Sequence, residues 1–298
     1  MAAAELEHYL VEVDGSRVSF TVTGAGRPLV LLHGWAGFWR PFVSLFGADL
    51  GVRLYAFDMP GWQPAAALGQ EHPLCAWADA VYRTLRLLGI DEKVPVMGNS
   101  MGALTAMLLA DRHPDMVDRL ILASPPVALF NHGPKRWLLQ AFSQVMMRYP
   151  PMLWLVERTH KSRWYNVAVA RWTTFYQYDP VVFEEVIMPS ALACDERTSL
   201  GQTISLLDVD IRALVCRIPN TTAIVTGDRD PLVPLDGARM MAELLRDGHL
   251  LVIPRAKHGI MLEQAHEFRD LVLGFLQSRT IPAPASVPPE GVPLGGLT

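Results

Sequence analysis

Short apolar runs alternate with longer stretches of helical periodicity along most of the chain. This alternation predicts a mainly parallel β-sheet with helices on both faces. The first run, VEVDGSRVSFTVTG, contains Asp14-Gly15 between two alternating segments, which predicts an antiparallel hairpin. The remaining runs predict buried strands that end in polar or glycine-containing loops. These runs are PLVLLHG, RLYAFDMPG, VPVMGNS, DRLILASPP, TAIVTGDRD and LLVIPRAKHG.

The alternation stops in the middle of the chain. Residues 129–205 are rich in Trp, Tyr and Met and contain no clear parallel strand, which predicts a helical lid inserted after the sixth strand. Residues 1–128 and 206–280 would then form one core built from both ends of the chain. Residues 281–298 are rich in Pro and Gly, which predicts a disordered tail.

Charge and cysteine usage narrow the possible partners. The formal net charge is −4, and no run among the 26 basic residues forms the stripe that nucleic-acid binding needs. Cys75, Cys194 and Cys216 lie far apart, which argues against a disulfide framework or a zinc site and fits a reducing compartment. The N-terminus lacks signal-peptide features, and no segment reaches the roughly 18 apolar residues of a membrane span. We therefore expect a cytoplasmic protein that does not bind membranes.

One segment carries the sharpest chemical signal. In VPVMGNSMGALTAMLLADRHP, an apolar strand leads through Gly98-Asn99-Ser100-Met101-Gly102 into an apolar helix. This is the G-x-S-x-G pattern of a nucleophile elbow, in which glycines two before and two after the serine relieve crowding at a strained turn. Ser100 is the predicted nucleophile. Because Met101 begins the helix, its backbone N–H is a predicted donor to an oxyanion.

Three further motifs resemble those of the α/β-hydrolase fold superfamily. His33-Gly34 follows the third strand, where that family forms its oxyanion loop, and the resemblance implies Trp35 N–H as the second oxyanion donor. We expect His33 to hold this loop rather than to transfer protons. Asp58-Met59-Pro60-Gly61 resembles the family's D-x-P-G turn, and we expect no catalytic role for Asp58. The implied fold is the α/β-hydrolase fold, an eight-stranded sheet flanked by helices.

The third motif supplies a base, and a separate segment supplies an acid. His258 follows the last strand in AKHGIMLEQAHEF, similar to the family's terminal histidine motif, and is the predicted general base. His113 and His266 do not lie at strand ends and are expected to be structural. The segment TGDRDPLVP offers two acids, of which the family spacing favours Asp230 and leaves Asp228 as the alternative. The chain order of serine, aspartate and histidine matches this fold.

A serine nucleophile indicates acyl transfer, so the expected activity is hydrolysis of an apolar or aromatic ester, thioester or lactone. No metal, nucleotide or other cofactor motif is present. One alternative is carbon–carbon hydrolysis, because GNSMG resembles the elbow of the meta-cleavage-product hydrolases. That family tends to have a glycine-rich oxyanion loop and a Trp after the histidine, which this chain lacks. A second alternative is a hydrolase fold used for binding or for non-hydrolytic cyclisation.

The lid is expected to select the substrate. Because a lid helix must bury its own apolar face, we expect most lid aromatics to pack rather than to touch substrate. The aromatic residues concerned are Trp137, Trp154, Trp164, Tyr165, Trp172, Phe175 and Tyr176.

Overall fold

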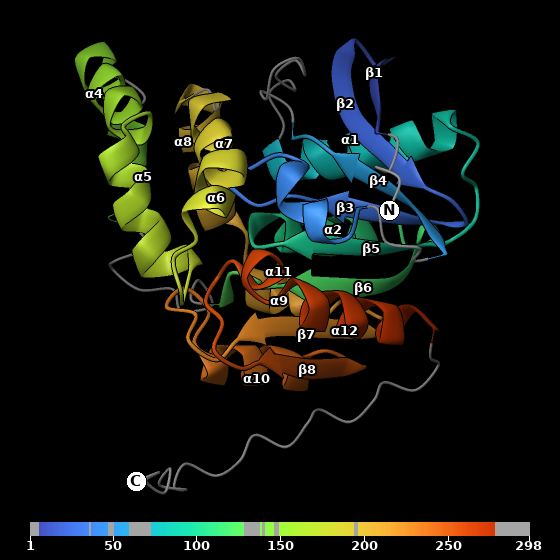
Figure 1. Ribbon diagram of the computed structural model, residues 1–298. Coiled ribbons are helices and arrows are strands. Elements are labelled where there is room, and N and C mark those ends of the chain that lie inside the picture. The colour runs from blue at the N-terminus through green and yellow to red at the C-terminus, as the bar shows by residue number, and fades with distance from the viewer. Residues whose placement is uncertain are drawn as a thin grey trace, which may run out of the picture.

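The computed structural model describes residues 6–35, 37–46, 51–59, 73–127, 138, 141–145, 149–193 and 196–277. Within them, eight strands form one sheet in the order β1-β2-β4-β3-β5-β6-β7-β8 (Figure 1). This confirms the predicted eight-stranded sheet. The strands are β1 (Glu7–Val13), β2 (Ser16–Gly24), β3 (Arg27–Leu32), β4 (Val52–Phe57), β5 (Val94–Asn99), β6 (Val117–Ala123), β7 (Thr222–Gly227) and β8 (Gly248–Ile253).

The predicted hairpin opens the sheet. β1 pairs antiparallel with β2, and β2 pairs antiparallel with β4, whereas all pairs from β4 to β8 are parallel. Asp14 and Gly15 connect the first two strands with φ angles of 50° and 76°. A two-residue turn with positive φ at both positions matches the twist of a hairpin, so this local signal could be read directly from the sequence.

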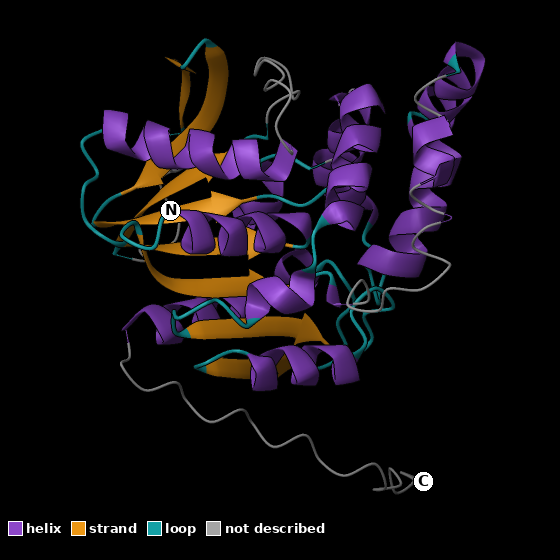
Figure 2. Cartoon of the chain, turned by 180° about the vertical axis from the view of Figure 1, so that it is seen from behind, coloured by secondary structure: helices purple, strands orange, loops and turns teal. Residues whose placement is uncertain are grey.

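Helices cover both faces of the sheet, as Figures 1 and 2 show from opposite sides. Alternate side chains of β3 face opposite ways: Val30 and Leu32 join the core on one face, and Leu29 and Leu31 join the core on the other. The first face carries α1 (Pro73–Leu87), α2 (Met101–Arg112), α9 (Ile211–Val215) and α10 (Leu235–Leu244). The second carries η1 (Arg40–Ser44), α11 (Ile260–Glu263) and α12 (Ala265–Gln277).

Further helices lie between β6 and β7 in the chain. They stand beyond the end of the sheet toward which the parallel strands run (Figures 1 and 2), and we call them the lid. Ala170, Phe175, Phe183 and Met188 form a small apolar cluster within it. The lid elements are α4 (Pro150–His160), α5 (Arg163–Val169), η3 (Ala170–Thr174), α6 (Pro180–Val182), η4 (Phe183–Ile187), α7 (Met188–Ala193) and α8 (Glu196–Asp208).

The domain limits at residues 128 and 206 stay predictions. The segment 281–298 and Trp137 lie outside the described residues. No helix in the described ranges is both long and apolar enough to cross a lipid bilayer.

A buried carboxylate joins the two helices nearest the elbow. Asp79 of α1 accepts hydrogen bonds from Arg112 Nε at 2.8 Å and from His113 Nε2 at 2.7 Å, both at the C-terminal end of α2. The Tyr82 ring stacks on His113 at 3.8 Å between centroids. Burial alone would raise the pKa of Asp79, but the bonds from Arg112 and His113 lower it below its ordinary value. This contact anchors the far end of the helix that begins after Ser100.

Replacing Asp79 by asparagine should lower the free energy of unfolding by about 1–3 kcal/mol, because the variant removes the buried charge that accepts hydrogen bonds from Arg112 and His113. Urea denaturation followed by circular dichroism measures this loss. The matched control is Asp236→Asn, which removes an exposed carboxylate paired with Arg239 and should change stability by less than about 0.5 kcal/mol. Equal effects in the two variants would contradict the anchoring role.

Candidate active site

A single residue, Ser100, connects β5 to α2. Its backbone has φ 53° and ψ −115°, outside the regions that a serine normally adopts. A Cβ on Gly98 would lie 2.1 Å from the carbonyl oxygen of Gly102, and a Cβ on Gly102 would lie 2.0 Å from that of Leu32. Neither position therefore admits a side chain, and the two glycines of the motif allow the strained turn to form.

The strained turn leaves the Ser100 side chain half-buried at the edge of the sheet. Its backbone N–H donates to the carbonyl of Ala123 at 2.8 Å, which ties the elbow to β6. Within the described residues, the Ser100 hydroxyl has no hydrogen-bond partner. Met101 is the first residue of α2, where backbone N–H groups have no acceptor inside the helix. The helix N-terminus therefore presents its positive end beside the hydroxyl.

The loop after β3 lies against the elbow. A Cβ on Gly34 would lie 3.2 Å from Ser100 Cβ, so the backbone of this loop closely approaches the serine. The Gly37 N–H donates to the Gly34 carbonyl at 3.1 Å and closes a tight turn. Trp35 follows Gly34 directly and so lies beside Ser100. The assignment of the Trp35 and Met101 N–H groups as oxyanion donors remains a prediction, and this approach is the geometry that it requires.

His33 joins the loop after β3 to the loop after β4 by two hydrogen bonds. Its Nδ1–H donates to the Gly34 carbonyl, and its Nε2 accepts from the Met59 N–H, both at 2.8 Å. These partners fix the tautomer, because a carbonyl only accepts and an amide N–H only donates. Burial lowers the pKa of His33 to about 4, although the bond to Gly34 opposes this shift. A buried, neutral imidazole with both nitrogens occupied suits the structural role expected for it.

Asp58 supports the same pair of loops. It accepts from the Ser19 hydroxyl at 2.6 Å and from the Trp39 N–H at 3.2 Å. Burial raises the pKa of Asp58 to about 6, even though both hydrogen bonds favour the charged form. The carboxylate is therefore retained at a cost in stability at neutral pH. No contact of this group reaches Ser100 or His258 in the described structure.

Asp58→Asn tests this cost through its pH dependence. A carboxyl whose pKa rises from 3.8 when unfolded to about 6 when folded destabilises the protein as pH rises through that interval. The destabilisation is absent from the variant, so the stability of the variant relative to the wild type should increase by about 2 kcal/mol between pH about 4 and about 7. Urea titrations at several pH values measure the difference. A difference that is constant with pH would contradict the raised pKa.

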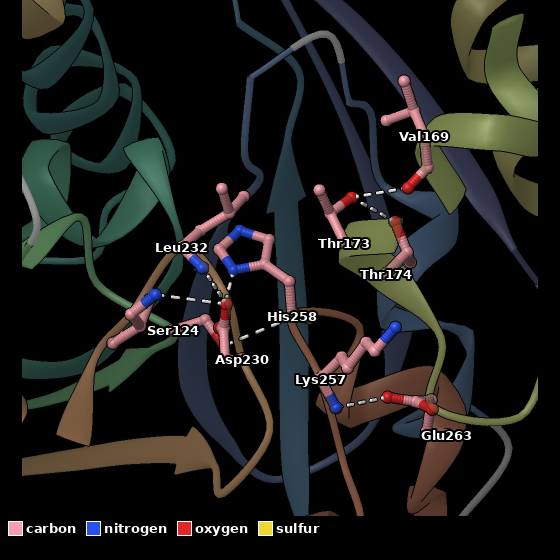
Figure 3. Close-up of polar contacts among 10 residues, drawn as sticks. Ser124, Val169, Thr173, Thr174, Asp230, Leu232, Lys257, His258 and Glu263 are labelled. Atoms are coloured by element: carbon pink, nitrogen blue, oxygen red, sulfur yellow. Dashed lines mark hydrogen bonds and ion pairs between the residues drawn. The ribbon is translucent and has the colours of Figure 1, made fainter. Parts of the chain in front are cut away.

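The predicted base and acid form a direct contact. His258 Nδ1–H donates to Asp230 Oδ2 at 2.8 Å (Figure 3). The Asp230 side chain is fully buried, and its second oxygen accepts from the N–H groups of Leu232 at 2.8 Å and Val233 at 3.1 Å. These bonds hold the carboxylate in place. A proton on Nδ1 leaves Nε2 of His258 free to accept one, which is the tautomer that a general base requires.

The alternative acid lies elsewhere. Asp228 accepts from the Ala256 N–H at 3.4 Å and forms an ion pair with Arg229 at 3.5 Å. It has no contact with His258 among the described residues. The structure thus brings Asp230, and not Asp228, to the histidine. Of the other histidines considered, His113 caps α2 and His266 lies within α12, so neither shares this edge of the sheet.

Asp230→Asn should reduce kcat by about two to four orders of magnitude, because an amide in this position favours the wrong tautomer of His258. Asp228→Asn is the matched control, since it makes the same chemical change two residues away and should retain activity within about threefold. Steady-state kinetics on an ester that the wild type hydrolyses compares the two variants. The reverse order of effects would assign Asp228 as the acid.

Ser124 has a role that the sequence did not indicate. In the structure it is fully buried with φ 45°, and its hydroxyl donates to the His258 carbonyl at 3.3 Å (Figure 3). It thus helps to hold the histidine loop. Its position at a strand end was the only available signal.

The lid contacts the oxyanion loop through aromatic rings. The Trp35 ring meets His160 of α4 edge to face at 5.3 Å, and His160 stacks on Tyr165 of α5 at 5.5 Å. The Trp35 side chain is 40% exposed.

The expectation that most lid aromatics pack is wrong for four of them. Trp154, Trp164, Trp172 and Tyr176 are 59%, 70%, 66% and 46% exposed, whereas Phe175 is buried in the lid cluster. For Trp164 the reason is that its helix, α5, has no buried residue, so no second layer covers the outer face. In the described ranges, no three His, Cys, Asp or Glu side chains are grouped to hold a metal ion.

Comparison with known proteins identifies the family. Residues 27–265 match the model of the alpha/beta hydrolase fold family, which covers most of the chain. The fold and the arrangement at the strand ends define the same class. The chain belongs to the alpha/beta hydrolase fold family and is a hydrolase of this fold, as the sequence motifs predicted.

Curated relatives match over nearly their full length. The chain is 26% identical over 287 residues to a 2-hydroxy-6-oxo-6-phenylhexa-2,4-dienoate hydrolase from Burkholderia cepacia, covering 87% of this chain and 91% of the relative. It is 27% identical over 274 residues to a 2-hydroxymuconate semialdehyde hydrolase from Pseudomonas putida, covering 88% and 91%. At this identity, the similarity indicates a common family without fixing the substrate.

Solved structures with other names share the fold. An esterase from Exiguobacterium antarcticum superposes with a TM-score of 0.73 at 21% identity, covering 93% of this chain and all of the esterase. An enol-lactonase from Burkholderia xenovorans has a TM-score of 0.73 at 20% identity, covering 91% of this chain and all of the lactonase. These likenesses support the architecture alone.

Proposed function

We propose that this chain is a serine hydrolase that cleaves a small to medium apolar or aromatic ester, thioester or lactone through an acyl-enzyme. The observation that carries the proposal is the elbow, which holds Ser100 in a strained turn at the N-terminus of α2. Strain of this kind costs about 1–3 kcal/mol and persists at sites where a side chain must be presented for reaction. The His258–Asp230 pair supports the proposal with a base of the required tautomer.

The reaction has two steps. His258 Nε2 takes the proton of the Ser100 hydroxyl while Oγ attacks the substrate carbonyl, and the same proton then goes to the departing alcohol, thiol or ring oxygen. Water attacks the acyl-enzyme with His258 again as base and releases the acid. The Trp35 and Met101 N–H groups are the proposed donors to the tetrahedral oxyanion, and such a donor is typically worth about 3 kcal/mol.

In the free enzyme, the Ser100 hydroxyl has no hydrogen bond within the described chain. Hydrogen bonds of this kind are often long or misaligned before substrate binds, and they tighten in the reacting complex. The Trp35 ring contacts His160 of the lid at 5.3 Å between ring centroids. Substrate bound beside Trp35 would therefore lie close to both the lid and the elbow.

A pre-steady-state assay with p-nitrophenyl esters of increasing acyl length tests the chemistry. The wild type should release a burst of p-nitrophenol close to one per chain, because acylation of Ser100 precedes the slower release of acid. Ser100→Ala should abolish the burst and lower kcat by more than about a thousandfold. Ser16→Ala, in the β1–β2 hairpin, removes a hydroxyl outside the site and should leave both values unchanged.

A second candidate is carbon–carbon bond hydrolysis. The observation that favours it is the near full-length similarity to the dienoate hydrolases, at 23–28% identity. Against it stand the Trp35-Ala36-Gly37 loop and the absence of Trp shortly after His258, where Ile260-Met261-Leu262 follows. Both reactions require a carbonyl held beside Ser100, so the elbow does not separate them.

The substrate of the first relative separates the two candidates. 2-Hydroxy-6-oxo-6-phenylhexa-2,4-dienoate carries a conjugated chromophore that disappears on cleavage. If kcat/KM for this dienoate exceeds that for every ester tested, carbon–carbon hydrolysis replaces ester hydrolysis as the function. If neither is turned over and the burst is absent, a binding or cyclisation role takes the place of both.

A further inference from the structure

The backbone of the histidine loop is held by the lid. The His258 N–H donates to the Thr173 carbonyl at 3.0 Å, and the Gly259 N–H donates to the Thr174 carbonyl at 2.9 Å. Both acceptors belong to η3, a π-helical turn of the lid. The position of His258 therefore depends on a segment that lies outside the β-sheet core.

The two segments are in contact at the level of the backbone. A Cβ on Gly259 would lie 2.7 Å from Thr174 Cγ2 and 2.8 Å from the Thr174 carbonyl oxygen. Gly259 has an ordinary negative φ of −84°, so close approach and not conformation requires a glycine here. The Lys257 ammonium donates to the Arg171 carbonyl at 2.7 Å and adds a side-chain contact across the same junction.

One carboxylate accepts hydrogen bonds from the backbone of both segments. Glu263, the last residue of α11, accepts from the Lys257 N–H at 2.7 Å through Oε2 (Figure 3). Through Oε1 it accepts from the N–H of Tyr176, which follows η3 in the lid. Burial raises the pKa of Glu263, although hydrogen bonds from the Lys257, Tyr176 and Gln177 N–H groups oppose the shift. Both oxygens of this half-buried carboxylate therefore accept hydrogen bonds from backbone N–H groups.

We propose that Glu263 is a positioning residue that couples the lid to His258, so that docking of residues 171–178 and correct placement of the catalytic imidazole occur together. The inference rests on the proposed function, because it takes His258 as the general base. Its consequence is that a substrate which displaces the lid also moves His258 relative to Ser100. Binding of the acyl group against the lid would then change the position of His258.

The chemistry of the contact explains why a carboxylate is needed. Two acceptor oxygens face N–H donors from two different segments, and an ionised glutamate supplies both. Glutamine has nearly the same shape but only one acceptor, so in Glu263→Gln an NH2 group must face a backbone N–H. The variant breaks one arm of the bridge without creating a cavity.

The experiment compares Glu263→Gln with Glu267→Gln, a matched control that removes the same charge from an exposed position in the first turn of α12. Amide hydrogen exchange in peptides covering residues 171–178 and 255–259 should accelerate by about tenfold in Glu263→Gln. kcat on a p-nitrophenyl ester should fall by about tenfold to a hundredfold, with KM changed by less than about threefold, because the base is misplaced and binding is retained. The control should match the wild type in both readouts.

Gly259→Ala provides a second variant that acts on the same junction from the opposite side. Its methyl group must displace Thr174, so it should reproduce the local exchange and the selective loss of kcat even if Glu263→Gln does not fold. Wild-type exchange and kcat in the folded variants would overturn the proposal. So would faster exchange throughout the sheet with kcat unchanged, which indicates a merely structural role.

The outcome distinguishes this inference from the proposed function. If the wild type shows no burst with any ester, the acyl-enzyme function fails, and hydrogen exchange still decides whether Glu263 couples the two segments. If the wild type shows a burst and Glu263→Gln matches it in kcat and local exchange, the function stands and the coupling is wrong.

Discussion

Where β3, β5 and α2 meet, the backbone leaves no room for a side chain at Gly98 or Gly102, and only these glycines allow Ser100 to adopt its strained conformation. Every other part of the site is arranged around that turn. β6 accepts the Ser100 N–H, the oxyanion loop lies against Ser100 Cβ, and α2 directs its free N–H groups toward the hydroxyl. The strain persists because the surrounding backbone permits no relaxed alternative.

Buried polar groups stabilise this arrangement from the core side. His33 and Asp58 connect β2, β3 and the loops after β3 and β4, and Asp79 holds the far end of α2. Each of these buried polar groups is hydrogen-bonded. Leaving its partner unpaired would cost more free energy than the hydrogen bond itself contributes to stability. These hydrogen bonds tie the loop after β3 and the elbow helix to the core of the sheet. His258 is different, since part of its backbone bonding comes from the lid itself.

Local signals in the sequence predicted most of the fold and the chemical centre. The Asp14-Gly15 turn, the six strand-like runs and the glycines around Ser100 each follow from the conformational needs of a few adjacent residues. The pairing of Asp230 with His258 was predicted from a family resemblance and not from a local pattern, because the two residues are 28 positions apart in the chain. The roles of Ser124 and Glu263 were not predicted, since they depend on backbone groups that only tertiary folding brings near. The exposure of Trp154 and Trp164 was also missed, because no local pattern shows whether a second layer covers a helix.

The central claim is that Ser100, activated by His258, forms a covalent bond to the substrate. Labelling with diethyl p-nitrophenyl phosphate followed by peptide mass spectrometry tests it most directly, because an activated serine displaces p-nitrophenol and retains the phosphoryl group. We predict one diethylphosphoryl group per chain on the peptide that contains Ser100, and slow or absent labelling in His258→Ala. Ester turnover by a protein that remains unlabelled at Ser100, or labelling that does not depend on His258, would contradict the account.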